Sequence, residues 1–70
     1  MNSLTFDFLK HQITARLDAH GPATSERLAS ELAVPHGNVL FALEQLKGKE
    51  KCVRCLPFGL WDVTENIRKS

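Results

Sequence analysis

The chain has 70 residues, of which 43% are hydrophobic and 24% are charged, the composition of an ordinary globular protein with at most one domain. A domain of this length buries only about 60% of its unfolded surface, so it needs a dense core or a partner. No apolar run approaches the roughly 20 residues that cross a bilayer, and the N-terminal segment lacks the pattern of a secretory signal. We therefore expect a cytoplasmic protein without a membrane partner.

The positive charge is concentrated in one segment, although the formal net charge is only +1. Residues 47–54 carry four cations and one anion, which leaves the rest of the chain with a net negative charge. The four cations are Lys47, Lys49, Lys51 and Arg54. A basic strip of this kind is either a solvated loop or a contact for phosphate groups.

The hydrophobic pattern predicts a first helix over residues 3–20. Its main apolar stripe consists of Phe6, Leu9, Ile13 and Leu17. A second stripe, nearly opposite, consists of Leu4, Phe8, Ala15 and Ala19. A helix that is apolar on two sides is covered on both or meets a partner. Leu4 and Phe8 are therefore candidates for protein contact, including contact with a second copy of the chain.

Two short helices are predicted next, over residues 25–33 and 37–47. Thr24 or Ser25 can cap the earlier one, and Pro35 disfavours helical geometry at the preceding residue, which predicts a turn between them. The inner face of the earlier helix consists of Leu28, Ala29 and Leu32. The later helix has a core stripe of Val39, Ala42, Leu43 and Leu46.

The C-terminal part predicts a β-hairpin over residues 51–64, with strands at 51–56 and 60–64 joined by a tight turn at Pro57–Gly59. Trp61 and Val63 share one face of the second strand, so we expect them to pack on the helices. Residues 65–70 form a polar tail. The expected fold class is mainly α with a small β-hairpin (α+β).

The segments 23–29, 32–34, 38–46 and 59–63 resemble the winged helix-turn-helix superfamily of small bacterial and phage regulators. In helix spacing they are similar to the MarR, ArsR and PapI type of module. The resemblance implies a single domain over residues 1–70, with three helices plus a two- or three-stranded wing. It also implies that the helix at 37–47 is a recognition helix for the DNA major groove. The chain departs from the family at Glu50 and Lys51, where a glycine and an apolar residue are usual.

This resemblance predicts a small DNA-binding transcriptional regulator whose partner is double-stranded DNA. The candidate contacts to bases or backbone are Ser25, at the start of the preceding helix, and six residues at the start and on the outer side of the recognition helix: His36, Gly37, Asn38, Leu40, Phe41 and Gln45. Amides can bond adenine and apolar side chains can touch a thymine methyl, whereas the basic strip would hold phosphates.

A protein-interaction module is the alternative, because the exposed face of the recognition helix is unusually apolar. In this interpretation Leu40 and Phe41 anchor another protein, such as a larger regulatory protein, and Leu4 and Phe8 add a second apolar surface. A third possibility is that Leu40 is simply buried under the hairpin.

Cys52 and Cys55 form a CxxC pattern, which invites a metal or redox interpretation. In an extended strand, however, the two side chains point to opposite faces, and a zinc site needs four ligands. We therefore expect structural cysteines, no metal and no cofactor, with a redox or metal sensor as the alternative. The sequence contains no nucleophile–base pair, paired carboxylates or phosphate-binding glycine loop at usable spacing, so we do not expect an enzyme.

Overall fold

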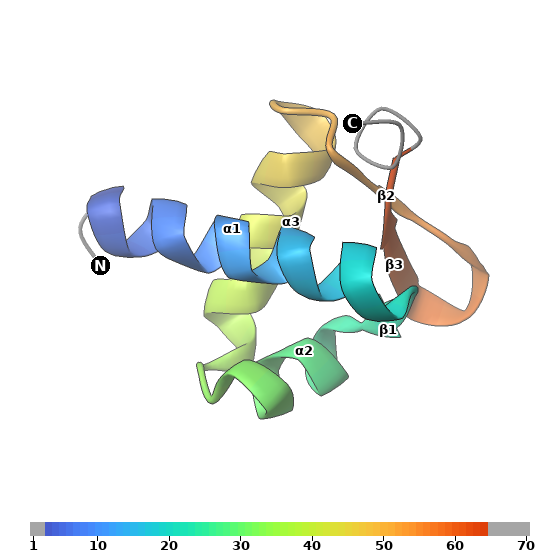
Figure 1. The fold of residues 1–70 in the computed structure, drawn as a ribbon, viewed down its shortest axis with the longest axis horizontal. Helices are drawn as coiled ribbons and strands as arrows, with labels where there is room; N and C mark the ends of the chain where they lie inside the picture. Colours follow the sequence, from blue (N-terminus) through green and yellow to red (C-terminus); the bar gives the residue numbers. More distant parts are fainter. Residues whose placement is uncertain (1–2, 65–70) are drawn as a thin grey trace.

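The computed structural model describes residues 3–64, with side chains from residue 5 onward, and contains three helices and a three-stranded antiparallel sheet (Figure 1). In chain order the elements are α1 (Ser3–His20), β1 (Ala23–Thr24), α2 (Ser25–Leu32), α3 (His36–Gly48), β2 (Val53–Cys55) and β3 (Leu60–Val63). This is a mainly helical α+β fold, as predicted. The predicted tail at 65–70 and the side chain of Leu4 lie outside the described part of the chain.

The two short helices begin and end where local chemistry favours it. Thr24 caps α2, because its hydroxyl oxygen accepts a hydrogen bond from the backbone N–H of Arg27 at 3.1 Å. The helix ends at Ala33, whose φ of 57° is left-handed, and Pro35 then precedes the first residue of α3. Helix α2 ends one residue earlier than predicted, and α3 begins one residue earlier and ends one residue later than predicted.

The core lies where the helices meet the sheet, and most residues of the predicted stripes supply it, whereas Phe6 and Leu32 are only partly buried against it. From the helices, the buried apolar side chains are Leu9, Ile13, Leu17, Leu28, Ala29, Val39, Ala42, Leu43 and Leu46. Ala23 from β1, together with Val53, Trp61 and Val63 from the hairpin, completes the core, so the expectation that Trp61 and Val63 pack on the helices is confirmed. As a result α3 is fixed to the rest of the molecule along one whole face.

The sheet has the strand order β1-β3-β2. Ala23 pairs with Trp61 in β3, so β1 adds a third strand beside the predicted hairpin. The predicted strand at 51–56 is too long, since β2 begins only at Val53. The reason is local: Lys51 has a left-handed φ of 56°, and the N–H of Cys52 donates to the carbonyl of Leu46 at 2.8 Å. These residues therefore close the end of α3 before the strand begins.

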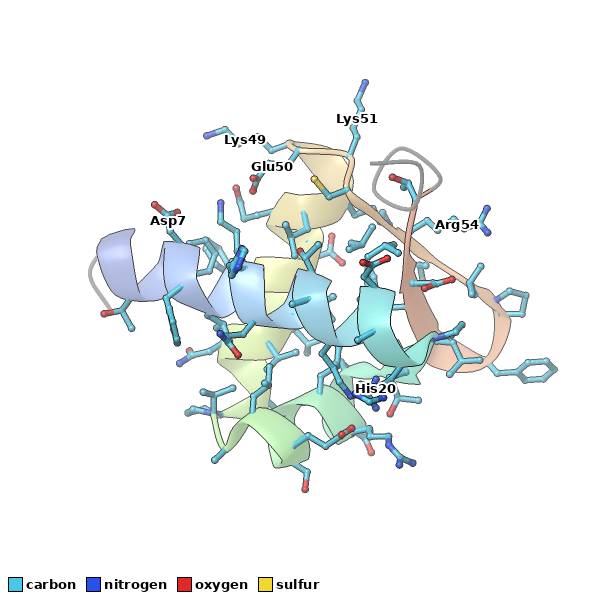
Figure 2. All side chains as sticks on the ribbon, viewed as in Figure 1. Asp7, His20, Lys49, Glu50, Lys51 and Arg54 are labelled. Carbon is cyan, nitrogen blue, oxygen red and sulfur yellow. The ribbon has the colours of Figure 1, made fainter. Side chains whose placement is uncertain are left out.

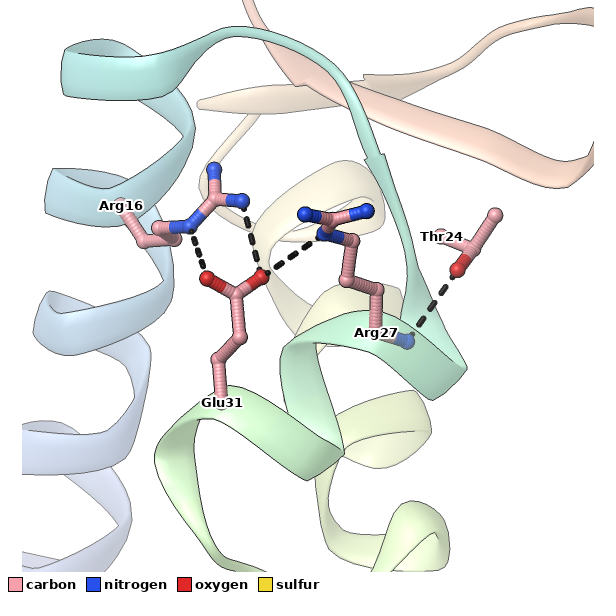
Figure 3. A network of polar contacts seen from close by, with 4 residues as sticks. All are labelled: Arg16, Thr24, Arg27 and Glu31. Atoms are coloured by element: carbon pink, nitrogen blue, oxygen red, sulfur yellow. Dashed lines mark hydrogen bonds and ion pairs between the residues drawn. The ribbon is translucent and has the colours of Figure 1, made fainter.

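A network of ion pairs joins α1 to α2 (Figure 3). Arg16 donates two hydrogen bonds to the carboxylate of Glu31, at 3.0 and 2.8 Å, and Arg27 donates a third at 3.2 Å. The hydrogen bonds from Arg16 are the main cause that lowers the pKa of Glu31 below its ordinary value. The network thereby holds α2, and with it the start of α3, against α1.

Within residues 3–64, no helix combines the length and the apolar character required to span a membrane.

Candidate nucleic-acid interface

The first group of predicted contact residues lies where the N-terminal ends of α2 and α3 meet. A hydrogen bond of 2.8 Å joins Ser25 Oγ to His36 Nε2, so the structure brings these two side chains together. Gly37 is exposed and Asn38 is half-buried in the first turn of α3. Because Pro35 gives α3 no side-chain cap, backbone N–H groups at this end face a site where an anion is favoured.

The outer residues of α3 divide between two edges of the helix. Successive residues turn by about 100°, which puts Asn38, Phe41 and Gln45 on one edge. This edge faces α1, since the Phe41 ring lies 5.2 Å from that of Phe6. Asn38 and Gln45 are half-buried there. The amides that the sequence predicts as base readers therefore have limited access to a large ligand.

The other edge of α3 carries His36, Leu40 and Lys47, and it faces α2 and the sheet. His36 bonds to Ser25 at the start of α2, and the Lys47 ammonium lies 5.8 Å from the centre of the Trp61 ring. Leu40 is 37% exposed, so the possibility that it is buried under the hairpin is wrong. On this edge the exposed Leu40 therefore lies between two polar side chains, His36 and Lys47, which have contacts of their own.

The basic strip lies at the opposite end of α3 from Ser25 and His36. Lys49 and Lys51 project from the C-terminal end of the helix, and Arg54 projects outward from β2 (Figure 2). A helix of 13 residues is about 20 Å long, so this length separates the strip from the first group. The structure therefore does not gather all the predicted contacts in one place but arranges them along α3.

Glu50, the one anion of the basic segment, is engaged elsewhere. Its carboxylate accepts a hydrogen bond from the Lys10 ammonium at 2.6 Å, and this bond is the main cause that raises the pKa of Lys10. Among the described residues, no ion pair involves Lys47, Lys49, Lys51 or Arg54. Their charges therefore remain open to an anionic ligand.

Of the predicted apolar contacts, Phe8 and Phe41 lie around the N-terminal half of α1, whereas Leu40 lies on the other edge of α3, so Leu40 and Phe41 do not form one anchor. Phe41 is 58% exposed although it touches Phe6, and Phe8 is 65% exposed. Phe8 borders a mainly apolar groove of about 170 Å³ between α1 and the end of α2. The groove is lined by Thr5, Phe8, Leu9, Gln12, Leu32 and Val34. Of the second predicted stripe, Ala15 and Ala19 are likewise exposed.

Cys52 and Cys55 are free thiols in different surroundings. Cys52 precedes β2 and is half-buried against the core, whereas Cys55 ends the strand and is exposed. Within residues 3–64, no group of three or more histidine, cysteine, aspartate or glutamate side chains is arranged to hold a metal ion.

Phe58 is a candidate contact that the sequence reasoning missed. The sequence predicts only that it belongs to a tight turn, yet Phe58 is 96% exposed at the tip of the hairpin. The available signal was an aromatic residue beside Gly59 at a turn position where asparagine, aspartate or glycine is usual.

Comparisons of the chain with protein-family models, with curated proteins and with solved structures gave no match.

Proposed function

We propose that the chain is a winged helix-turn-helix module that binds double-stranded DNA and acts as a small transcriptional regulator. The order of elements supports this, because a helix pair joined by a short turn is followed by a hairpin whose last strand also pairs with β1. In such modules the second helix of the pair enters the major groove.

The observation that carries the proposal is the edge of α3 that bears His36, Leu40 and Lys47. The buried residues of α3, which include the neighbouring Leu43, fix the helix against the rest of the molecule, so this edge is held rigidly beside the core. Its start adjoins the N-terminus of α2 through the hydrogen bond between Ser25 and His36. Its far end leads to cations without ion pairs among the described residues.

The side chains of this surface suit different parts of a duplex. Ser25 and His36, beside two helix N-termini, fit a backbone phosphate, and Leu40 fits a thymine methyl group. Lys49, Lys51 and Arg54 fit phosphates about one helix length away. Glu44 is also exposed on α3 and is tolerated near DNA only where it accepts from a cytosine amine.

A ¹⁵N-HSQC titration with a short random-sequence duplex at low salt tests this function. We expect shifts at Ser25, His36, Leu40 and Lys47 that fade as salt is added, with little change at Phe8. An unchanged spectrum would overturn DNA binding. A Leu40→Glu variant, which places an anion in the centre of the surface, should abolish the shifts while leaving the fold intact.

A protein-interaction module is the second candidate, favoured by the exposure of Phe8 and Phe41 beside an apolar groove. These residues lie on the α1 side of the molecule and not on the edge that we assign to DNA. The partner is a larger regulatory protein or a second copy of the chain. Light scattering at high concentration tests the second copy: a dimer mass that Phe8→Ala lowers supports it, and a monomer mass excludes it.

A further inference from the structure

The tip of the β2–β3 hairpin holds an aromatic residue in an unusual backbone conformation. Cys55 pairs with Trp61, and the N–H of Leu56 donates to the carbonyl of Leu60 at 2.7 Å, which leaves a three-residue loop, Pro57–Gly59. Phe58 has a φ of 67° and Gly59 a φ of 73°, so two consecutive residues are left-handed. Glycine tolerates this region, whereas a phenylalanine is rarely found there.

The Phe58 side chain contributes little to the stability of the fold that could offset this strain. Its side chain is 96% exposed, so almost none of its apolar surface is removed from water. Strained residues persist where the surrounding structure holds them, and they cluster at functional sites. An outward-facing aromatic ring at a strained position therefore points to a ligand that the ring contacts.

The charges around the tip favour a polyanionic ligand over an apolar protein socket. No residue from Cys55 to Trp61 carries a charged side chain, and the next anion, Asp62, is only 3% exposed. The nearest exposed charge on the hairpin is Arg54, which projects outward from β2 (Figure 2). The buried Asp62 lies opposite Arg54 in the sheet, and the exposed charge on β2 is the Arg54 cation, four residues from the ring, which attracts a phosphate backbone.

We propose that Phe58 is a wedge that stacks against base pairs in a groove of duplex DNA, while Arg54 contacts a flanking phosphate. The inference rests on the proposed function, since it assigns a second contact to the same ligand. Apolar wedges of this kind partly unstack a base step and bend the duplex, and base–aromatic stacking tolerates many sequences. The hairpin would thus add affinity without adding strict sequence requirements.

Fluorescence of 2-aminopurine tests the wedge, because its emission rises when a neighbouring base is unstacked. A set of duplexes carries the probe at flexible pyrimidine–purine steps, which cost least to open. We expect the wild-type protein to raise the emission at one or more steps. Phe58→Gly should remove this rise and weaken binding by roughly tenfold. The variant should fold, because glycine accepts the left-handed conformation of the loop.

His11→Ala is the control, since it removes an exposed ring from α1, outside the hairpin and outside both proposed binding surfaces, and should change neither readout. If wild type binds but Phe58→Gly binds equally well, the wedge is wrong and the proposed function stands. Weaker binding of Phe58→Gly without any rise for wild type also overturns stacking, since the ring then contacts only the groove wall. If wild type does not bind DNA, both proposals fail.

Discussion

Within residues 3–64, three residues other than glycine adopt a left-handed backbone conformation, Ala33, Lys51 and Phe58, and each lies where the chain leaves one element for the next. Ala33 ends α2, Lys51 follows α3, and Phe58 lies at the hairpin tip. At Ala33 the conformation is held by helix-end hydrogen bonds, because the N–H of Val34 donates to the carbonyl of Ala29 at 3.1 Å. At Ala33 the hydrogen bonds at the end of the helix therefore impose the left-handed conformation against the preference of the residue.

Replacing Ala33 with glycine should stabilise the protein. Relief of the left-handed strain outweighs the extra flexibility of glycine in the unfolded chain, for a gain of about 0.5–1 kcal/mol in the free energy of unfolding. Urea denaturation followed by circular dichroism measures it. Ala15→Gly, the same change at an exposed site inside α1, should instead lower the free energy by about 1 kcal/mol. Two shifts of the same sign would contradict the argument.

A turn can be predicted from the local sequence only where the residue at the turn favours left-handed backbone geometry. Gly21 and Gly59 fit this rule, and the sequence places a helix end and a hairpin turn at them. Lys51 does not fit, because lysine has no preference for left-handed geometry. The strand was consequently predicted to start two residues too early, at 51 and not at 53.

At the scale of elements, Glu31 couples two helices through charge. Arg16 on α1 and Arg27 on α2 both donate to its carboxylate (Figure 3). Since the pKa of Glu31 is lowered in the folded chain, its contribution to stability is complete above the ordinary glutamate pKa of about 4.3. That contribution disappears as the pH falls through the lower pKa of the folded state.

Glu31→Gln should therefore change how stability depends on pH. We expect the wild type to be more stable than the variant near neutral pH and the difference to vanish in acid. Denaturation curves recorded from pH 7 down to strongly acidic pH give the free energy of unfolding of each protein, and the values for wild type and variant should converge as the pH falls. Glu44 is exposed and has no ion pair among the described residues. Glu44→Gln should therefore leave the dependence of the free energy of unfolding on pH close to that of wild type. A constant difference in the free energy of unfolding between wild type and Glu31→Gln at every pH would refute the coupling.

The two leucines of α3 offer a test of which face holds the helix. Leu43 is fully buried, so Leu43→Ala should cost about 2–5 kcal/mol through lost burial and a residual cavity. Leu40 lies on the exposed edge, so Leu40→Ala should cost less than about 1 kcal/mol. Chemical denaturation of both variants decides the order. Equal losses would mean that α3 is rotated from the orientation described.

Helix faces were predictable because they follow from periodicity within one segment, as the stripe of Val39, Leu43 and Leu46 illustrates. The partner of a strand is a non-local choice. The two residues of β1 carry no local signal that they pair with β3, because Ala23 comes to lie opposite Trp61 only in the folded chain. For the same reason the sequence placed Asn38 and Gln45 on an open face, whereas the packing of α1 half-covers that edge.

At the scale of the whole molecule, the two candidate surfaces are spatially separate. The N-terminal half of α1, with Phe8, and the hairpin tip, with Phe58, lie at opposite ends of the longest axis, which measures 30 Å (Figure 1). A module with this layout could bind DNA through α3 and the hairpin while α1 meets a protein. The two proposed functions therefore do not compete for the same side chains.

Salt dependence separates the phosphate contacts from the base contacts on the DNA surface. If the four cations of the basic strip each neutralise one phosphate, the logarithm of the binding constant should fall with the logarithm of salt concentration at a slope of about −3 to −4. Replacing both Lys49 and Lys51 with glutamine should reduce the magnitude of that slope by about 2. Fluorescence anisotropy with a labelled duplex at several salt concentrations measures both values.

Leu40→Ala provides the contrast, because an apolar contact with a base releases no counterions. This variant should weaken binding at every salt concentration and keep the wild-type slope. An affinity of the wild type that does not change with salt would exclude the basic strip as a phosphate contact. A changed slope for Leu40→Ala, together with an unchanged slope for the double lysine variant, would mean that the duplex approaches a different face of the molecule.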